Sequence, residues 1–206
     1  AQRLPPQFHD AEGHWVALSL RARVFYVSKD RVDATALTYE GIAKPEWKGR
    51  VCTRAGDHVY NIGLVASRIA LWGVDKTRTW LAAVRDNLAY PPGGGDREGV
   101  KNILAGTCDL SITNTYYMGV MLNNKAEPEQ KEWANSARIV YPTTADGDGT
   151  QVNAAGAFIA KYAPNVANAN RLIEFLLSDE AQQLYANGNY EFPAVTSVQP
   201  AELTLS

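Results

Sequence analysis

Strand-like and helix-like segments alternate along most of this chain of 206 residues, and this alternation most constrains its fold. Short runs rich in Val, Phe and Tyr predict strands, whereas apolar residues at helical spacing predict helices. We expect strands at 15–20, 21–27, 50–53, 108–112 and 137–141, and helices at 63–72, 76–88, 97–105, 165–178 and 179–186. This order predicts an open, largely parallel α/β sheet, whose ligands bind beyond the carboxyl ends of the strands.

Two adjacent tyrosines, Tyr116 and Tyr117, follow the short apolar segment 109–113. On a strand their side chains would point to opposite faces, but a turn capped by Asn114 or Thr115 would let both phenols converge. Paired phenol oxygens suit a hard, highly charged cation, which displaces their protons although the pKa of a free phenol is about 10. The alternative is an ordinary aromatic pair, because 10 Tyr in 206 residues give about 0.5 adjacent pairs by chance.

A third tyrosine and two arginines also lie on or just after predicted strands. Tyr60 belongs to the polar loop 54–61, which leads from a predicted strand into a helix and presents free N–H groups suited to an anion. Its alternative role is an apolar contact at the start of that helix. Arg21 and Arg23 are two residues apart, so a strand projects both to one face, either into solvent or around an anion.

The chain has two cysteines, Cys52 and Cys108, and each adjoins a predicted strand. If these strands are neighbours, the sulfurs can form a disulfide, which would indicate an oxidising compartment. The alternative is a pair of buried free thiols.

Several functions are disfavoured by the sequence. It contains no Gly-x-Ser-x-Gly, His-Glu-x-x-His or phosphate-loop motif, and Gly93-Gly94-Gly95 is typical of a turn. His9, His14 and His58 lack metal-ligand spacing, so we expect surface or capping roles for them. The net charge of −2, the pI of about 6.0 and the scattered basic residues argue against a nucleic-acid or anionic-membrane partner.

A set of short motifs distributed over nearly the whole chain resembles one family. The motifs are WVAL at 15–18, RARV at 21–24, PEWKGRVC at 45–52, HVYN at 58–61, GGD at 94–96, GTCD at 106–109, NTYYMG at 114–119, APN at 163–165, LIEFL at 172–176 and NYEFP at 189–193. Together they resemble the periplasmic ferric-ion-binding proteins, which are the substrate-binding components of iron ABC importers.

The resemblance implies a type II periplasmic-binding-protein fold, in which two α/β lobes joined by two hinge strands close on iron. Residues 1–26 would form part of lobe 1 and a hinge, 27–140 lobe 2, and 141–206 the return to lobe 1. We expect the two hinge strands near 21–28 and 137–143. Relative to the family the chain starts late and stops early, so lobe 1 is expected to be incomplete, without the opening βα units that normally supply a further ligand.

The resemblance also implies the site. Tyr60, Tyr116 and Tyr117 correspond to phenolate ligands of Fe³⁺. Arg21 or Arg23, with Asn114, would hold a synergistic carbonate or bicarbonate anion. Phosphate is disfavoured, because Asp96 would repel it and the loop 54–57 lacks the small Ser/Thr-rich form of phosphate-binding relatives. The likeness to an exported protein implies that Cys52 and Cys108 are joined.

The expected function is therefore capture of ferric iron in the periplasm by a monomer that delivers it to an ABC permease in the inner membrane, without catalysis. One alternative is a binding protein for another metal chelate or an oxyanion, which three convergent tyrosines disfavour because an oxyanion requires hydrogen-bond donors. The other is an enzyme on the same fold, for which the sequence offers no acid/base pair at suitable spacing.

Overall fold

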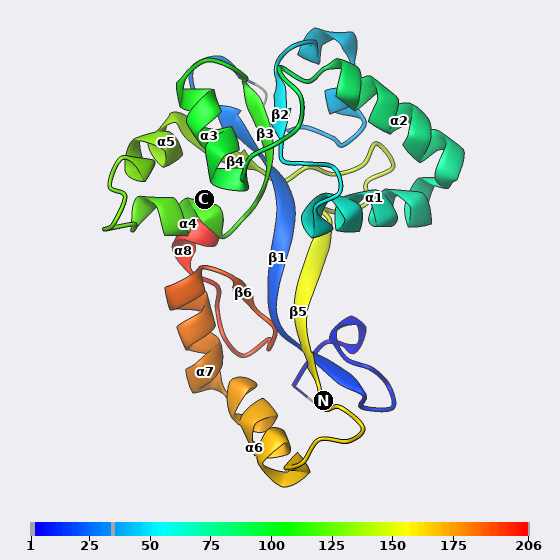
Figure 1. Ribbon diagram of the computed structural model, residues 1–206, viewed down its shortest axis with the longest axis vertical. Helices are drawn as coiled ribbons and strands as arrows, with labels where there is room; N and C mark the ends of the chain where they lie inside the picture. The colour runs from blue at the N-terminus through cyan, green and yellow to red at the C-terminus, as the bar shows by residue number, and fades with distance from the viewer. Residues whose placement is uncertain (1–2, 34–35, 206) are drawn as a thin grey trace. The chain divides into compact units, whose positions relative to one another are not determined.

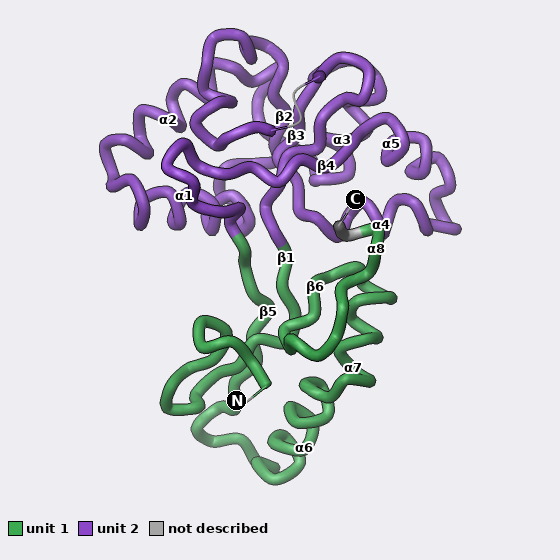
Figure 2. The backbone as a smooth tube through the Cα atoms, turned by 180° about the vertical axis from the view of Figure 1, so that it is seen from behind, with its two compact units in different colours: residues 1–21, 152–206 green, residues 22–151 purple. Residues whose placement is uncertain are grey.

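The computed structural model describes residues 3–33 and 36–205, and it divides the chain into two compact units (Figures 1 and 2). Unit 1 comprises residues 1–21 and 152–206, and unit 2 comprises residues 22–151. The chain passes from one unit to the other at Arg21–Ala22 and again at Gln151–Val152. Residues 1–2 and 206, at the ends of the predicted lobe 1 segments, lie outside the described residues.

The sheet of unit 2 has the strand order β2-β3-β1-β4. Its strands are β1 (Trp15–Ser28), β2 (Val51–Thr53), β3 (Leu110–Asn114) and β4 (Ala137–Val140). β2 and β3 are parallel, but β1 lies antiparallel between β3 and β4, with Phe25 opposite both Ile112 and Val140. The prediction of a largely parallel sheet is therefore wrong for the pairings of β1 with β3 and of β1 with β4.

The reversed direction of β1 has a simple origin in the chain. Parallel strands require a long crossover, usually helical, and β2 is joined to β3 in this way through α1, α2 and α3. The connection from β1 to β2 instead contains two short 3₁₀ turns, η2 (Gly41–Ala43) and η3 (Pro45–Trp47). An irregular connection of this kind does not force β1 to run parallel to the other strands. The alternation of strand-like and helix-like segments in the sequence does not reveal the direction of a strand.

Among the described residues of unit 2, the α-helices are α1 (Val59–Trp72), α2 (Val74–Asp86), α3 (Asp96–Leu104), α4 (Tyr117–Leu122) and α5 (Gln130–Ser136). The first three confirm the predicted helices, although α1 begins four residues early. Its start is stabilised by His58, whose Nδ1 accepts a hydrogen bond from the Tyr60 backbone N–H at 3.2 Å. Every residue of β3 is buried, as expected of a strand covered on both faces, so its carboxyl end is held firmly in place.

Unit 1 is smaller. Ser19 and Leu20 of β1 pair with β6 (Phe192–Pro193), and β5 (Val152–Phe158) also pairs with β1. The predicted helices at 165–178 and 179–186 are present as α6 (Val166–Leu176) and α7 (Asp179–Leu184), and α8 (Glu202–Leu205) follows. The buried apolar core of this unit consists of Leu4, Ala17, Leu20, Ala194, Val195 and Val198.

The second hinge strand, expected near 137–143, is misplaced. β4 lies inside unit 2, where it pairs with β1, and the second passage between units is at the start of β5. An extended apolar segment suits a sheet strand and a hinge equally well, so only the pairing partner distinguishes them. Within the described residues, no helix combines the length and the apolar character that crossing a membrane requires.

Candidate metal centre

Two of the three predicted ligand tyrosines touch. The hydroxyl oxygens of Tyr60 and Tyr116 lie 3.1 Å apart. Tyr60 is the second residue of α1, shortly after β2, and Tyr116 follows β3. Because β2 and β3 are parallel neighbours, their carboxyl ends meet at one edge of the sheet, and this brings the two phenols together.

Tyr117 stacks against Tyr116. Their ring centroids are 4.3 Å apart and the ring planes are tilted by 36°, so the two side chains do not diverge as they would on a strand. The turn arises because Tyr116 already has helical backbone angles (φ −63°, ψ −20°) and Tyr117 begins α4. The predicted convergence is present, and all three tyrosines belong to unit 2.

The capping role predicted for Asn114 or Thr115 is wrong. Thr115 Oγ1 accepts a hydrogen bond from the Ala22 backbone N–H at 3.3 Å, and Asn114 Oδ1 accepts one from Arg23 at 3.2 Å. Both side chains are therefore turned toward β1. The turn is instead supported by the buried Tyr26, whose hydroxyl donates to the carbonyl oxygens of Asn114 and Thr115 at 3.3 and 3.0 Å.

Burial keeps the paired phenols protonated in the metal-free chain. It raises the pKa of Tyr116 well above the ordinary value of 10, and hydrogen bonds with Tyr117 and Tyr60 raise it further. Burial likewise raises the pKa of Tyr117, although the hydrogen bond with Tyr116 opposes this shift. A highly charged cation is the kind of ligand that displaces such protons, because it stabilises the phenolate directly.

A buried ion cluster lies beside Tyr60. The carboxylate of Asp96, the first residue of α3, pairs with Arg23 and with Arg54, whose Nη1 is 3.4 Å away. The guanidinium carbons of Arg23 and Arg54 lie 5.7 and 5.0 Å from the centroid of the Tyr60 ring. Asp96 was expected to be an anion-repelling charge, but its carboxylate is neutralised by the two arginines.

The three residues predicted to bind an anion, Arg21, Arg23 and Asn114, differ from one another in burial and in the unit to which they belong. Arg23 and Asn114 are buried and bonded to each other, whereas Arg21 is only partly buried and belongs to unit 1. Among the residues that the structure describes, three buried donors of this cluster lack a hydrogen-bond partner: Arg23 Nε, Arg54 Nε and Asn114 Nδ2. The identity of the residues that contact an anion stays a prediction.

Sequence reasoning missed Asn61 and Tyr26. The Asn61 amide accepts a hydrogen bond from Arg23 at 2.8 Å and donates to the Arg54 carbonyl oxygen at 2.9 Å. Its position directly after Tyr60 was a usable signal, since a polar residue in the first turn of a helix often bonds the preceding loop. Tyr26 gave no such signal, because an aromatic residue on a strand is typical of any core.

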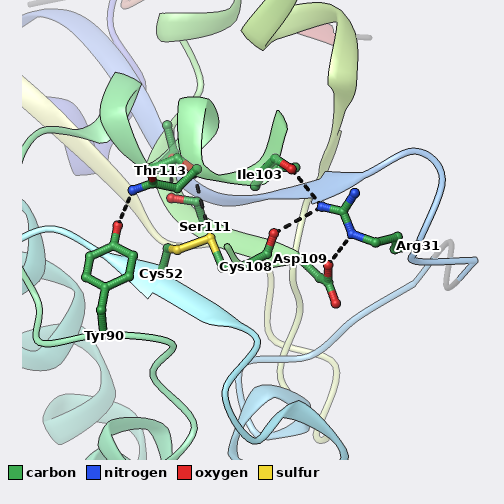
Figure 3. Close-up of a disulfide and its surroundings, with 10 residues drawn as sticks. Arg31, Cys52, Tyr90, Ile103, Cys108, Asp109, Ser111 and Thr113 are labelled. Carbon is green, nitrogen blue, oxygen red and sulfur yellow. Dashed lines mark hydrogen bonds and ion pairs between the residues drawn. A yellow bond between two sulfur atoms is a disulfide. The ribbon is translucent and has the colours of Figure 1, made fainter. Parts of the chain in front are cut away.

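The predicted disulfide between Cys52 and Cys108 is confirmed, with the two Cα atoms 6.0 Å apart (Figure 3). It joins β2 to the residues that precede β3. Beside it, Figure 3 shows Arg31 directed at Asp109, and the same carboxylate accepts a hydrogen bond from Arg50 Nε at 2.6 Å. These links lie at the amino-terminal end of β3, and the tyrosines follow its carboxyl end.

The histidines have the expected surface and capping roles. His58 caps α1, His9 Nδ1 lies 3.1 Å from the Asp10 carbonyl oxygen, and His14 Nδ1 lies 2.8 Å from Asp10 Oδ2. Across residues 3–33 and 36–205, no group of three His, Cys, Asp or Glu side chains is arranged to hold a metal ion. The cluster of Tyr60, Tyr116 and Tyr117 is the candidate metal centre because its phenol oxygens converge and can become negative ligands.

Comparison with known proteins places these observations in context. A sequence profile described as bacterial extracellular solute-binding protein matches residues 2–204. Iron uptake protein A2 of Synechocystis sp. is 39% identical over 199 residues, which are 96% of this chain and 57% of the relative. The chain thus spans little more than half the length of this relative.

Solved structures of iron-binding proteins are also similar to this chain in sequence and fold. A ferric binding protein of Bordetella is 44% identical, with a TM-score of 0.91 over 99% of this chain and 64% of that protein. A Trichodesmium protein, solved in complex with iron and citrate ligands, is 33% identical, with a TM-score of 0.91 over 98% of this chain and 64% of that protein.

Proposed function

The chain belongs to the bacterial extracellular solute-binding proteins, and we propose that it binds ferric iron through Tyr60, Tyr116 and Tyr117. Its fold is the type II periplasmic-binding-protein fold, as predicted. The 3.1 Å contact between the hydroxyl oxygens of Tyr60 and Tyr116 carries the proposal. Phenol oxygens that already touch need little movement to share one cation, and Fe³⁺ is hard enough to displace their protons.

The chemistry of the cluster favours a cation over an oxyanion. An oxyanion requires several converging hydrogen-bond donors. A phenol can donate only one hydrogen bond, and after losing its proton it becomes a negatively charged ligand. The names of the relatives support the same choice, since they describe iron uptake and ferric binding.

An anion that binds together with iron fits the surroundings of Tyr60. Within the part of the chain that the structure describes, Arg23 Nε and Asn114 Nδ2 are buried donors without a hydrogen-bond partner, and a partner would remove the cost of leaving them unsatisfied. We propose carbonate or bicarbonate as this anion, held by Arg23 and Asn114, or by Arg21. The citrate bound with iron in the Trichodesmium protein is consistent with an oxygen-rich companion to the metal.

The whole protein would act in transport and not in catalysis. In this proposal it is a periplasmic monomer that receives Fe³⁺ and passes it to the permease of an ABC importer in the inner membrane. In this proposal lobe 2, expected at residues 27–140, corresponds to unit 2 (residues 22–151) and carries the three tyrosines, whereas unit 1 (residues 1–21 and 152–206) belongs to lobe 1.

The direct test is titration of the purified chain with ferric nitrilotriacetate, followed by visible absorbance, because a phenolate bound to iron gives a coloured charge-transfer band. We expect a band that saturates at one iron per chain. Molybdate and thiosulfate serve as competing candidates in thermal-shift measurements. A colourless titration, together with stabilisation by either oxyanion, would contradict the proposal.

A further inference from the structure

We propose that Asp96 is the positioning residue of this centre, a single buried carboxylate that holds Tyr60 and Tyr116 at a fixed separation. The inference rests on the proposed ferric site and adds to it a residue that is not itself a ligand. It reverses the role expected from the sequence, where Asp96 was a repulsive charge.

The Asp96 side chain is fully buried, and both of its oxygens are engaged. Oδ2 accepts hydrogen bonds from Arg23 Nη1 and from the Asn114 backbone N–H, the latter at 3.0 Å. Oδ1 accepts one from Arg54 Nη1 at 3.4 Å. Asp96 also opens the nine-residue helix α3, where the helix dipole favours a negative charge. The carboxylate therefore joins β1, the loop after β2 and the end of β3.

One branch of this network leads to Tyr60. Arg23 donates from Nη2 to Asn61 Oδ1 at 2.8 Å, and Asn61 Nδ2 donates to the carbonyl oxygens of Arg54 and Ala55 at 2.9 and 3.2 Å. Asn61 directly follows Tyr60 in the first turn of α1. The start of the helix that carries Tyr60 is thus bonded to an arginine that Asp96 holds.

The other branch leads to Tyr116. The backbone N–H of Asn114 donates directly to Asp96, and Tyr116 lies two residues further along the chain. The hydroxyl of Tyr26 also donates to the carbonyl oxygens of Asn114 and Thr115 in the same stretch of backbone. Because both branches end on one carboxylate, the loss of its charge should loosen the contact between Tyr60 and Tyr116.

The charges of the cluster also favour the ligated state. Two guanidinium groups face one carboxylate, which leaves a net positive charge, and both guanidinium carbons lie within 5.7 Å of the centroid of the Tyr60 ring. A positive charge at this distance and depth stabilises the negative charge that Tyr60 carries when it binds iron.

The decisive variant is Asp96→Asn, which keeps the size of the side chain and removes its charge. Its matched control is Asp109→Asn, because Asp109 also bridges two arginines, Arg31 and Arg50, in the same unit. Both proteins are labelled with 3-fluorotyrosine, and the ¹⁹F resonances of Tyr60 and Tyr116 are assigned from Tyr→Phe variants. Without iron, we expect Asp96→Asn to shift or broaden both resonances and Asp109→Asn to leave them unchanged.

Ferric titration supplies the second readout. We expect Asp96→Asn to bind iron at least about tenfold more weakly and with a shifted charge-transfer band, and Asp109→Asn to stay within about twofold of the unmodified chain. If Asp96→Asn does not fold, Arg54→Gln, which removes one partner of the carboxylate and one cation beside Tyr60, should give a smaller effect in the same direction. The double variant Arg23→Gln/Asp96→Asn removes both charges of the closest pair and should still show the shifted tyrosine resonances.

The outcomes separate this inference from the function on which it rests. Unchanged fluorine resonances and unchanged iron affinity in folded Asp96→Asn would overturn the positioning role, as would equal effects of Asp96→Asn and Asp109→Asn. If the unmodified chain gives no iron band, while Asp96→Asn still displaces the tyrosine resonances, the ferric function fails and the positioning of the tyrosines stands.

Discussion

The hydroxyl oxygens of Tyr60 and Tyr116 lie 3.1 Å apart although the residues are 56 positions apart in the chain. Two features produce this contact. β2 and β3 are parallel neighbours, so the residues that follow them meet at one edge of the sheet, and the Cys52–Cys108 disulfide joins the same two regions of chain. The contact between the tyrosines is a consequence of this pairing of β2 with β3.

Each of the three tyrosines should contribute to iron binding without being needed for folding. Tyr60→Phe, Tyr116→Phe and Tyr117→Phe keep the ring and its packing, so the free energy of unfolding should change by no more than about 1 kcal/mol. Loss of a ligand should weaken ferric affinity at least about tenfold, since changes that only surround a metal site already cost this much. Ferric titration and thermal melts of each variant check both expectations.

The matched control for these variants is Tyr90→Phe. Tyr90 is a partly buried tyrosine of the same unit, whose hydroxyl accepts a hydrogen bond from Asn102 Nδ2 at 2.6 Å. Its loss should leave the iron band intact. Unchanged affinity in all three ligand variants, with intact folding, would exclude the tyrosine cluster as the metal site.

Iron binding should weaken as the pH falls. Burial raises the pKa of Tyr116 and Tyr117, so both phenols are protonated at neutral pH and must release their protons to bind iron. Lower pH favours the protonated, metal-free form, and the apparent affinity should fall about tenfold per pH unit for each proton released between about pH 5.5 and 7.5.

This pH dependence is measured by chelator competition across that range. Tyr117→Phe has one phenolic proton fewer to release, so its plot of log affinity against pH should be shallower by about one unit of slope. A pH-independent affinity in the unmodified chain would show that the ligands are not phenolates.

The Cys52–Cys108 disulfide should contribute strongly to stability. The cysteines are 56 residues apart, and closing a loop of this length removes conformational entropy from the unfolded chain equivalent to about 4 kcal/mol. Urea unfolding with and without reductant measures the difference. Mass spectrometry after alkylation without reductant should find no added alkyl group, and uptake of two groups would refute the bridge.

Close packing of α3 on β3 predicts a sensitive glycine. A Cβ atom on Gly99 would lie 2.2 Å from Ser111 Oγ and 3.2 Å from Ser111 Cβ, in a fully buried part of the sheet. Gly99→Ala should therefore destabilise the chain by about 1–3 kcal/mol. Because α3 begins with Asp96, a shift of this helix should also weaken iron binding.

Gly56→Ala is the control for this substitution, since a Cβ atom there meets nothing within 4 Å. Chemical unfolding of both variants gives the comparison. Equal stability of Gly99→Ala and the unmodified chain would mean that Ser111 moves aside without cost.

Much of this protein could be predicted from the sequence because the signals are local. Apolar spacing located α1, α2, α3, α6 and α7 to within a few residues. The adjacency of Tyr116 and Tyr117, just past a short apolar strand, indicated a turn at which both rings converge, and the rings do stack. Helix periodicity and strand ends depend on neighbours within a few positions in the chain, which a single sequence displays directly.

Only the tertiary structure decided which distant residues meet. β1 lies antiparallel between β3 and β4, and the second passage between units falls at the start of β5, neither of which segment alternation reveals. Asp96 was interpreted from the sequence as a charge that would repel an anion, yet its pairing with the guanidinium groups of Arg23 and Arg54 leaves the buried cluster with a net positive charge. The effect of a charge depends on the partners and the solvent around it, and these are set by strand pairing between residues far apart in the chain.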